Sequence, residues 1–195
     1  RRQRQMCIRD RCLTMLNEQG WAVTQDSNYE DIIYINSHRG SLEKSEAFIK
    51  GYITFMDKAS MLVARLVNPQ PGERILDCCA APGGKSMYMA TLMDNVGSLM
   101  SCDIHEHKIE LMNSNAERLG ASIVHTKVQD ATKLPDSWNS YFDRVLVDAP
   151  CSGLGILQKK LDMRWRKQES ILSELPPLQL AILERAAMTL SLIHI

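Results

Sequence analysis

The chain has 195 residues, 45% of them hydrophobic, a formal net charge of zero and six cysteines. This length suits one α/β domain with a sizeable core and little more. No apolar run is long enough to cross a membrane, and no CxxC pair or regular cysteine spacing occurs. The sequence therefore predicts a cytoplasmic protein with reduced thiols, without a metal site or a disulfide framework.

The two ends of the chain differ from the rest in composition. Five arginines crowd residues 1–11, and the chain closes on SLIHI. A basic arm of this kind is one pattern of nucleic-acid binding. Both strings are also similar to translated sequencing-adapter sequence. We therefore expect residues 1–11 and 189–195 to be foreign, and residues 12–47 to be the remnant of an upstream module.

The first predicted elements are short. Residues 12–20 are typical of the last turns of an amphipathic helix that ends at Gly20, and residues 32–35 are typical of a strand. The segment 48–68 should enter a helix in front of a sheet. The predicted packing face of this helix consists of Met61, Leu62, Ala64, Leu66 and Val67.

Residues 48–188 predict a doubly wound α/β domain. Apolar runs flanked by breakers predict strands, and apolar residues at spacings of three and four predict helices. The strands are expected at 74–79, 96–102, 123–128 and 142–147, and the helices at 86–93, 104–119 and 173–188. Strands separated by helical crossovers form a parallel sheet. The fourth strand is expected to leave an unpaired apolar edge.

Two prolines bear on the last of these helices. Pro176 and Pro177 lie near its expected start. Proline is tolerated in the first turn of a helix, where its missing N–H group has no intrahelical partner. The prolines are therefore expected near the first turn of a helix that begins at Ser173.

Residues that could carry chemistry follow the ends of the predicted strands. A glycine-rich turn follows the first strand, and Asp103, Asp130 and Asp148 follow the others. The carboxyl ends of parallel strands face one crevice. One such acid alone is more typical of a helix cap or a solvated turn. All four features in register predict a nucleoside site, with Asp103 on the ribose hydroxyls, Asp130 near the adenine edge and Asp148 near the transferred group.

A phosphate-binding P-loop is the alternative from a different class. That motif requires glycine at position 79, where the chain has Cys79, and Pro82 interrupts its run of N–H groups. The string VLVDAP at 145–150 could nevertheless pass for a strand with a magnesium-binding acid. A non-catalytic nucleotide-binding module therefore stays open, and magnesium-dependent ATP binding would reveal it.

Four strings together resemble the NOL1/NOP2/Sun family of S-adenosylmethionine-dependent RNA cytosine-5 methyltransferases, in its bacterial small-subunit rRNA branch. They are CAAPGGK at 79–85, DI at 103–104, DAPCSGLG at 148–155 and DMRW at 162–165. The resemblance spans about 48–188. It implies a Rossmann-like class I methyltransferase fold, truncated after the fourth strand, in a monomer that acts on rRNA. Residues 12–47 would then belong to an RNA-binding region.

The resemblance also implies the roles of individual residues. Asp148 and Cys151 would be catalytic, with Cys151 in the Pro-Cys motif that helps release the product. The nucleophile of this family, which adds to carbon 6 of cytosine, lies in a Thr-Cys motif. This chain contains no Thr-Cys dipeptide, which implies a fragment without the complete reaction. The implied S-adenosylmethionine site consists of Cys79, Ala80, Ala81, Pro82, Gly83, Gly84, Lys85, Asp103, Asp130 and Asp148.

Three further interpretations concern side chains. A nucleophilic Cys151, as in DNA cytosine methyltransferases, is the alternative to its role in product release. Cys78 and Cys102 are expected in the core, and Cys79 should contribute its backbone. A basic patch with a tryptophan suits phosphate neutralisation and base stacking as well as a solvated loop, and the resemblance favours RNA. This patch consists of Lys159, Lys160, Arg164, Trp165 and Arg166.

Overall fold

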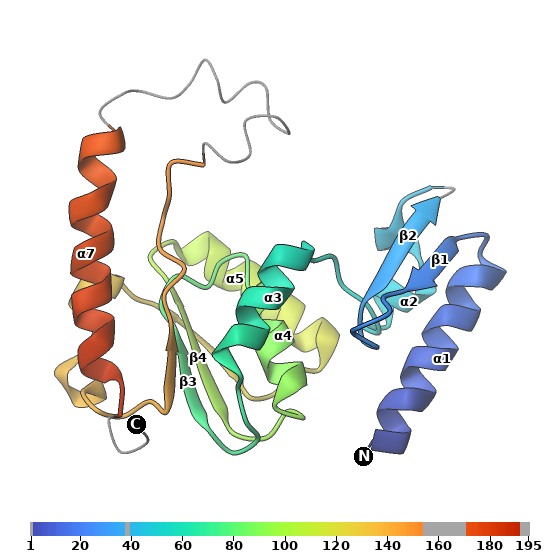
Figure 1. The fold of residues 1–195 in the computed structure, drawn as a ribbon, viewed down its shortest axis with the longest axis horizontal. Coiled ribbons are helices and arrows are strands. Elements are labelled where there is room, and N and C mark those ends of the chain that lie inside the picture. Colours follow the sequence, from blue (N-terminus) through green and yellow to red (C-terminus); the bar gives the residue numbers. More distant parts are fainter. Residues whose placement is uncertain (1, 38–39, 154–170, 192–195) are drawn as a thin grey trace. The chain divides into compact units, whose positions relative to one another are not determined.

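The structure is a computed structural model, and it describes residues 2–37, 40–153 and 171–191. By their internal contacts these residues form two units. The first comprises Arg1–Met56 with Glu117–Gly120, and the second comprises Asp57–Ala116 with Ala121–Ile195. Figure 1 shows the elements of each unit.

The first unit contains a helix and a hairpin. Its elements are α1 (Arg2–Glu18), β1 (Ala22–Gln25), β2 (Ile33–Ser37), the 3₁₀ helix η1 (Leu42–Lys44) and α2 (Glu46–Ile49). β1 and β2 pair antiparallel, and only the second of these strands was predicted. The small core of this unit consists of Cys12, Leu16, Trp21, Leu42 and Ala47.

The second unit is built on a four-stranded parallel sheet with the order β5-β4-β3-β6. The strands are β3 (Arg74–Asp77), β4 (Ser98–Asp103), β5 (Val124–Val128) and β6 (Arg144–Leu146). All four predicted strands are confirmed, with bounds that differ by at most two residues. The register pairs Ile75 with Leu99 and Asp77 with Ser101, so each pair lies on one face of the sheet.

Helices cover both faces of this sheet (Figure 1). One face carries α3 (Lys58–Val67), α4 (Gly84–Leu92) and α5 (Glu106–Leu119); the other carries α7 (Ile171–Thr189) and the 3₁₀ helices η2 (Ala131–Lys133) and η3 (Asp136–Trp138). The core beneath α7 consists of Leu76, Cys78, Cys102, Ala131, Leu134, Phe142, Ile182 and Ala186. The predicted α/β architecture is confirmed.

Two expectations for this unit were wrong, and a third was wrong in part. On the predicted packing face of α3 only Ala64 is buried, and Leu66 is 83% exposed. Pro176 and Pro177 lie inside α7, beyond its first turn, because the helix begins at Ile171. Because Pro176 has no N–H group, it cannot donate to the carbonyl of the exposed Leu172 four residues earlier, and water can satisfy that carbonyl.

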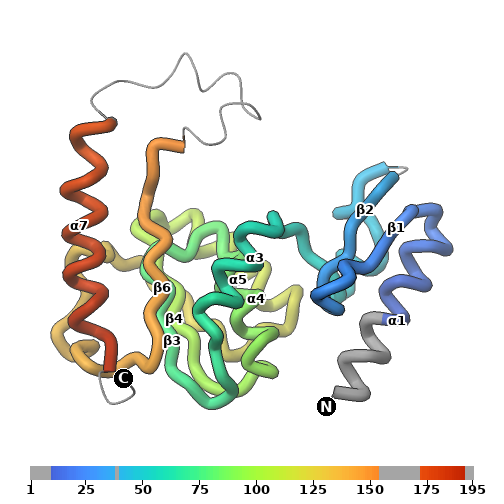
Figure 2. Tube along the Cα trace, viewed as in Figure 1, coloured from blue at the N-terminus to red at the C-terminus, as the bar shows by residue number. Residues whose placement is uncertain are grey.

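The third correction concerns the edge strand β6. The segment just before it pairs with the end of α7 and the residues that follow (Figure 2). The Phe142 N–H donates to the Thr189 carbonyl at 3.0 Å, and the Ser191 N–H donates to the Phe142 carbonyl at 2.7 Å. The predicted unpaired edge therefore holds for β6, which pairs with β3 alone among the described strands, and it is corrected at Phe142.

Candidate cofactor and catalytic site

The glycine-rich loop, residues 78–85, joins β3 to α4 and is tied to both neighbouring strands. The Cys78 N–H donates to the Leu146 carbonyl at 3.0 Å, and the Ala80 N–H donates to the Cys102 carbonyl at 2.7 Å. These bonds continue the sheet pairing beyond the end of β3. The loop therefore leaves the sheet at a defined point.

Gly83 shows why the loop needs glycine. Its φ of 94° lies in the left-handed region, and it caps the start of α4. A Cβ atom at this position would lie 2.9 Å from Cγ of Met112, so a side chain has no room. Met112 and Ile109, both buried on α5, pack against Ala80 and form the floor of the loop. A Cβ atom at Gly84 would meet nothing within 4 Å, so this side of the loop is open.

Asp77 and Ser86 flank the loop and close it from below. The Ser86 hydroxyl donates to Oδ2 of Asp77 at 2.7 Å, and both residues are buried. Among the described residues no donor has hydrogen-bond geometry to Oδ1 of Asp77, and Oγ of Ser101, its register partner, also has no partner. Sequence reasoning missed Asp77, although the string ILDCC shows an acid at the end of an apolar strand.

The buried carboxyl group of Asp77 is difficult to ionise. Burial raises its pKa from 3.8 to about 6. The Ser86 hydroxyl, the Lys85 ammonium and the nearby Cys79 N–H oppose this rise, and the negative charge of Asp148 adds to it. At neutral pH the protein thus holds a carboxylate in its core at a cost in free energy.

Asp103 is the last residue of β4, and one of its carboxylate oxygens is held by neighbouring groups. Its Oδ1 accepts from the His105 N–H at 3.0 Å and lies 3.6 Å from Nζ of Lys108. The side chain is only 10% exposed, and within the described part of the chain Oδ2 has no hydrogen-bond partner. A carboxylate held in this way can accept hydrogen bonds from vicinal hydroxyls.

Asp130 caps a short helix. Its Oδ1 accepts from the N–H and the hydroxyl of Thr132, at 2.9 and 2.7 Å, and these bonds hold the pKa of the carboxyl group below its usual range. Lys133 lies 3.8 Å from Oδ2. Asp130 therefore has a structural role at the end of β5, and its predicted place beside adenine stays a prediction.

Asp148 and Lys85 form an ion pair. Nζ of Lys85, in the first turn of α4, lies 2.7 Å from Oδ2 of Asp148, beyond the end of β6. Asp148 is half exposed. The chain that follows is fixed by Gln179 of α7, whose side-chain amide donates to the Pro150 carbonyl at 2.7 Å. Lys85, part of the implied cofactor site, thus contacts a carboxylate of the protein itself.

The cysteines separate into buried and exposed groups. Burial raises the pKa of the Cys79 thiol to about 11 and that of the Cys102 thiol to about 12, and it raises the pKa of Cys78 still further. These groups remain thiols at neutral pH and are poor nucleophiles. Cys151 alone among the described cysteines is exposed.

Part of the predicted site lies outside the described residues. This part is the predicted RNA-binding set of Lys159, Lys160, Arg164, Trp165 and Arg166. Where the structure is described, no group of three or more histidine, cysteine or acidic side chains could hold a metal ion. A search of the described helices finds none that is long and apolar enough to span a membrane.

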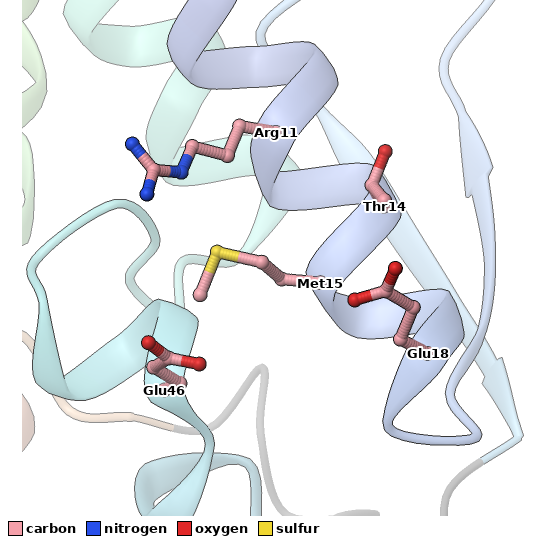
Figure 3. A pocket seen from close by; sticks show the side chains of 5 residues that line it. All are labelled: Arg11, Thr14, Met15, Glu18 and Glu46. Atoms are coloured by element: carbon pink, nitrogen blue, oxygen red, sulfur yellow. The ribbon is translucent and has the colours of Figure 1, made fainter.

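A surface hollow of about 390 Å³ occurs in the first unit and contains none of the motif residues (Figure 3). Its side chains come from α1 and α2: Arg11, Thr14, Met15, Glu18 and Glu46. The Glu46 side chain is half exposed, and a hydrogen bond and the charge of Lys50 lower its pKa. Solvated charges on short elements do not define a ligand, so this hollow is not the candidate site.

Comparisons with known proteins agree with this arrangement. The profile of the family described as 16S rRNA methyltransferase RsmB/F matches residues 64–192. A Bacillus subtilis protein named "Probable ribosomal RNA small subunit methyltransferase B" is 44% identical over 76% of this chain, which spans 34% of that relative. The chain thus spans about a third of the length of this relative.

Two solved structures from Pyrococcus horikoshii have similar folds. A methyltransferase homologue superimposes with a TM-score of 0.80 at 26% identity, over 93% of this chain and 57% of the other. NSun6, solved with SFG, gives 0.71 at 32% identity, over 78% of this chain and 38% of the other. The fold is Rossmann-like, the resemblance noted from the motifs is confirmed, and the chain belongs to the RsmB/F family within the NOL1/NOP2/Sun group.

Proposed function

We propose that this chain forms the S-adenosylmethionine-binding part of an enzyme that methylates carbon 5 of a cytosine in small-subunit rRNA. The observation that carries the proposal is the pairing of an open glycine-rich loop after β3 with the Asp103 carboxylate after β4. Both features lie at the carboxyl edge of a parallel sheet, where nucleosides bind. The similar NSun6 was solved with SFG, an analogue of S-adenosylmethionine.

The residues present fit this cofactor. Oδ2 of Asp103 would accept the ribose hydroxyls, because Oδ1 is already held by His105 and Lys108. The open side of the loop at Gly84 would admit the methionine portion close to the backbone. When bound, S-adenosylmethionine supplies an electrophilic methyl group on a positively charged sulfur. Asp130 would lie at the adenine end of the same edge.

Asp148 would meet the target base. Lys85 holds Oδ2, and the half-exposed side chain can still accept a hydrogen bond through Oδ1. The amino group on carbon 4 of cytosine is a suitable donor. Cys151, exposed three residues further on, would assist release of the methylated product. The base must leave its RNA stack to reach these groups.

The whole reaction requires a nucleophile that the resemblance places in a Thr-Cys motif. This chain contains no Thr-Cys dipeptide, so we infer that it binds the cofactor and transfers no methyl group alone. A radiolabelled methyl-transfer assay with 16S rRNA tests this inference. Incorporation of label by the purified chain would contradict it, and labelling that disappears in Cys151→Ala would assign the attack to Cys151.

Calorimetric titration with S-adenosylmethionine tests the cofactor site. We expect saturable binding by this chain and loss of at least tenfold in affinity in Asp103→Ala, because ribose hydroxyls would lose their acceptor. Glu110→Ala, which removes an exposed acid from the outer side of α5, is the matched control and should bind normally. Binding of magnesium-ATP in place of S-adenosylmethionine would overturn the proposal in favour of the nucleotide-binding alternative.

A further inference from the structure

Four carboxyl groups lie at the carboxyl edge of the sheet, and three of them have a lysine partner. Lys108 and Lys133 lie just after their acids in the chain, and Lys85 comes from the start of α4 to meet an acid that follows β6. The pairs are Lys85 with Asp148 at 2.7 Å, Lys108 with Asp103 at 3.6 Å and Lys133 with Asp130 at 3.8 Å. In the described part of the chain the fourth carboxyl group, Asp77, has no ion pair within 4 Å.

The lone charge of Asp77 is also the most buried of the four. Asp77 is 1% exposed, and Ser86 donates a hydrogen bond to its Oδ2. Charge in such surroundings is weakly screened, so it acts over a longer range than charge at the surface. Its negative charge reaches the loop, because it raises the pKa of the thiols at Cys78, Cys79 and Cys102.

The two forms of the proposed cofactor differ in charge at one atom. S-adenosylmethionine carries a positive sulfonium, and S-adenosylhomocysteine, left after methyl transfer, carries a neutral thioether. The lysines balance the charges of the other three acids, which leaves Asp77 as the unbalanced negative charge beneath the loop. Burying a carboxylate without a counter-ion is costly, and perturbed buried groups of this kind are concentrated at functional sites.

We infer that Asp77 is a specificity-determining residue, which makes the site prefer the cationic S-adenosylmethionine over the neutral S-adenosylhomocysteine. This inference rests on the proposed function. Asp77 would act through its charge and without contact with the ligand, because its carboxylate is covered by the loop and by Ser86. Preference for the charged form favours exchange of the spent cofactor after each reaction.

The preference should depend on pH. The pKa of Asp77 is raised to about 6, so its charge is present at pH 7.5 and largely absent at pH 5. Other charged or titratable groups act on it from the neighbouring elements: Lys85, Asp148, Cys78, Cys79 and Cys102. An Asp77→Asn variant keeps all of these groups, so the difference between the two proteins isolates Asp77.

The test measures dissociation constants of both ligands at pH 7.5 and pH 5 by calorimetry. We expect Asp77→Asn to reduce the preference for S-adenosylmethionine roughly fivefold to tenfold at pH 7.5, the size of a screened interaction between unit charges. At pH 5 the two proteins should show similar preferences. Ser86→Ala is a companion variant: it removes the hydrogen bond that lowers the pKa of Asp77, so it should weaken the preference at pH 7.5 in the same direction as Asp77→Asn, but less.

A second variant, with the opposite expected change in preference, keeps the inference testable if Asp77→Asn does not fold. Lys108→Met removes a positive charge from the same edge and should increase the preference for S-adenosylmethionine. An unchanged ratio in Asp77→Asn and in Lys108→Met, or a wild-type ratio that does not vary between pH 7.5 and pH 5, would overturn the inference. Failure of the wild-type chain to bind either ligand would instead refute the proposed function.

Discussion

The two edges of the parallel sheet differ in how fully the oxygens of their carboxylates are paired. At the amino edge Asp143 accepts the Arg74 N–H at 2.7 Å and the Arg74 guanidinium at 3.2 Å, and Glu73 binds Arg144 through both oxygens, at 2.7 and 3.0 Å. At the carboxyl edge one oxygen of Asp77 has no partner among the described residues, and Asp148 is half exposed.

This difference separates groups that hold the fold from groups that remain available to a ligand. Bidentate arginine–carboxylate pairs satisfy every oxygen and fix strand ends against one another. Single lysine contacts at Asp148 and Asp103 engage only one oxygen of each acid and leave the other for a ligand. The amino edge of this sheet is therefore a structural support, and the carboxyl edge carries unsatisfied chemistry at a cost in stability.

The largest expected effect is a gain in stability in Asp77→Asn. The folded-state pKa of about 6 lies above the unfolded value of 3.8, so the folded protein binds the proton more tightly and loses stability as pH rises from about 4 to 6. The asparagine variant avoids this loss. Its free energy of unfolding should exceed that of the wild type by about 1–3 kcal/mol at pH 8.

The same advantage should fall below about 1 kcal/mol near pH 4, where Asp77 is protonated in the folded state and only partly ionised in the unfolded state. Urea denaturation at pH 8 and pH 4 measures both values. A loss of stability in the variant at pH 8 would show that the carboxylate at this position stabilises the fold, and the contrast between the two edges would fail.

Asp143→Ala should have the next largest effect, in the opposite direction. It removes the acceptor of the Arg74 N–H and of its guanidinium, so the free energy of unfolding should fall by about 2 kcal/mol. Asp136→Ala is the control, since that exposed acid pairs with Arg185 at the surface and should cost less than about 1 kcal/mol. Equal losses of unfolding free energy in the two variants would show that the arginine–carboxylate pairs of the amino edge contribute no more than a surface ion pair.

Lys133→Ala should have the smallest effect. Its side chain is 80% exposed and its contact with Asp130 is 3.8 Å long, so the free energy of unfolding should change by less than about 0.5 kcal/mol. Thermal unfolding at low and high salt measures this change. A clear, salt-dependent loss would mean that Lys133 supports the carboxyl edge more than its geometry indicates.

The sequence alone predicted the sheet and the edge that carries the candidate site. Apolar runs bounded by breakers identified β3, β4, β5 and β6, because buried parallel strands require continuous apolar residues. The positions of Asp103 and Asp148 at strand ends then followed from topology, since parallel strands place their carboxyl ends together.

What the sequence could not predict depends on tertiary neighbours. The pairing of Lys85 with Asp148 joins residues that are far apart in the chain, and the burial of Asp77 depends on α4 lying across β3. The periodicity of α3 indicated a packing face, but it could not indicate whether another element covers Leu66. The capping bonds of Asp130 likewise depend on the turn that follows β5.

The methionine beneath the loop has a consequence for oxidative damage. Met112 is fully buried against Gly83, so an oxidant cannot reach its sulfur while the loop remains closed. Oxidation to the sulfoxide would add a polar oxygen to an apolar floor and prevent the loop from closing again. The rate of oxidation at Met112 therefore reports how often the loop opens. A ligand that holds the loop closed should slow this reaction, and the enzymatic repair of the sulfoxide would restore the loop.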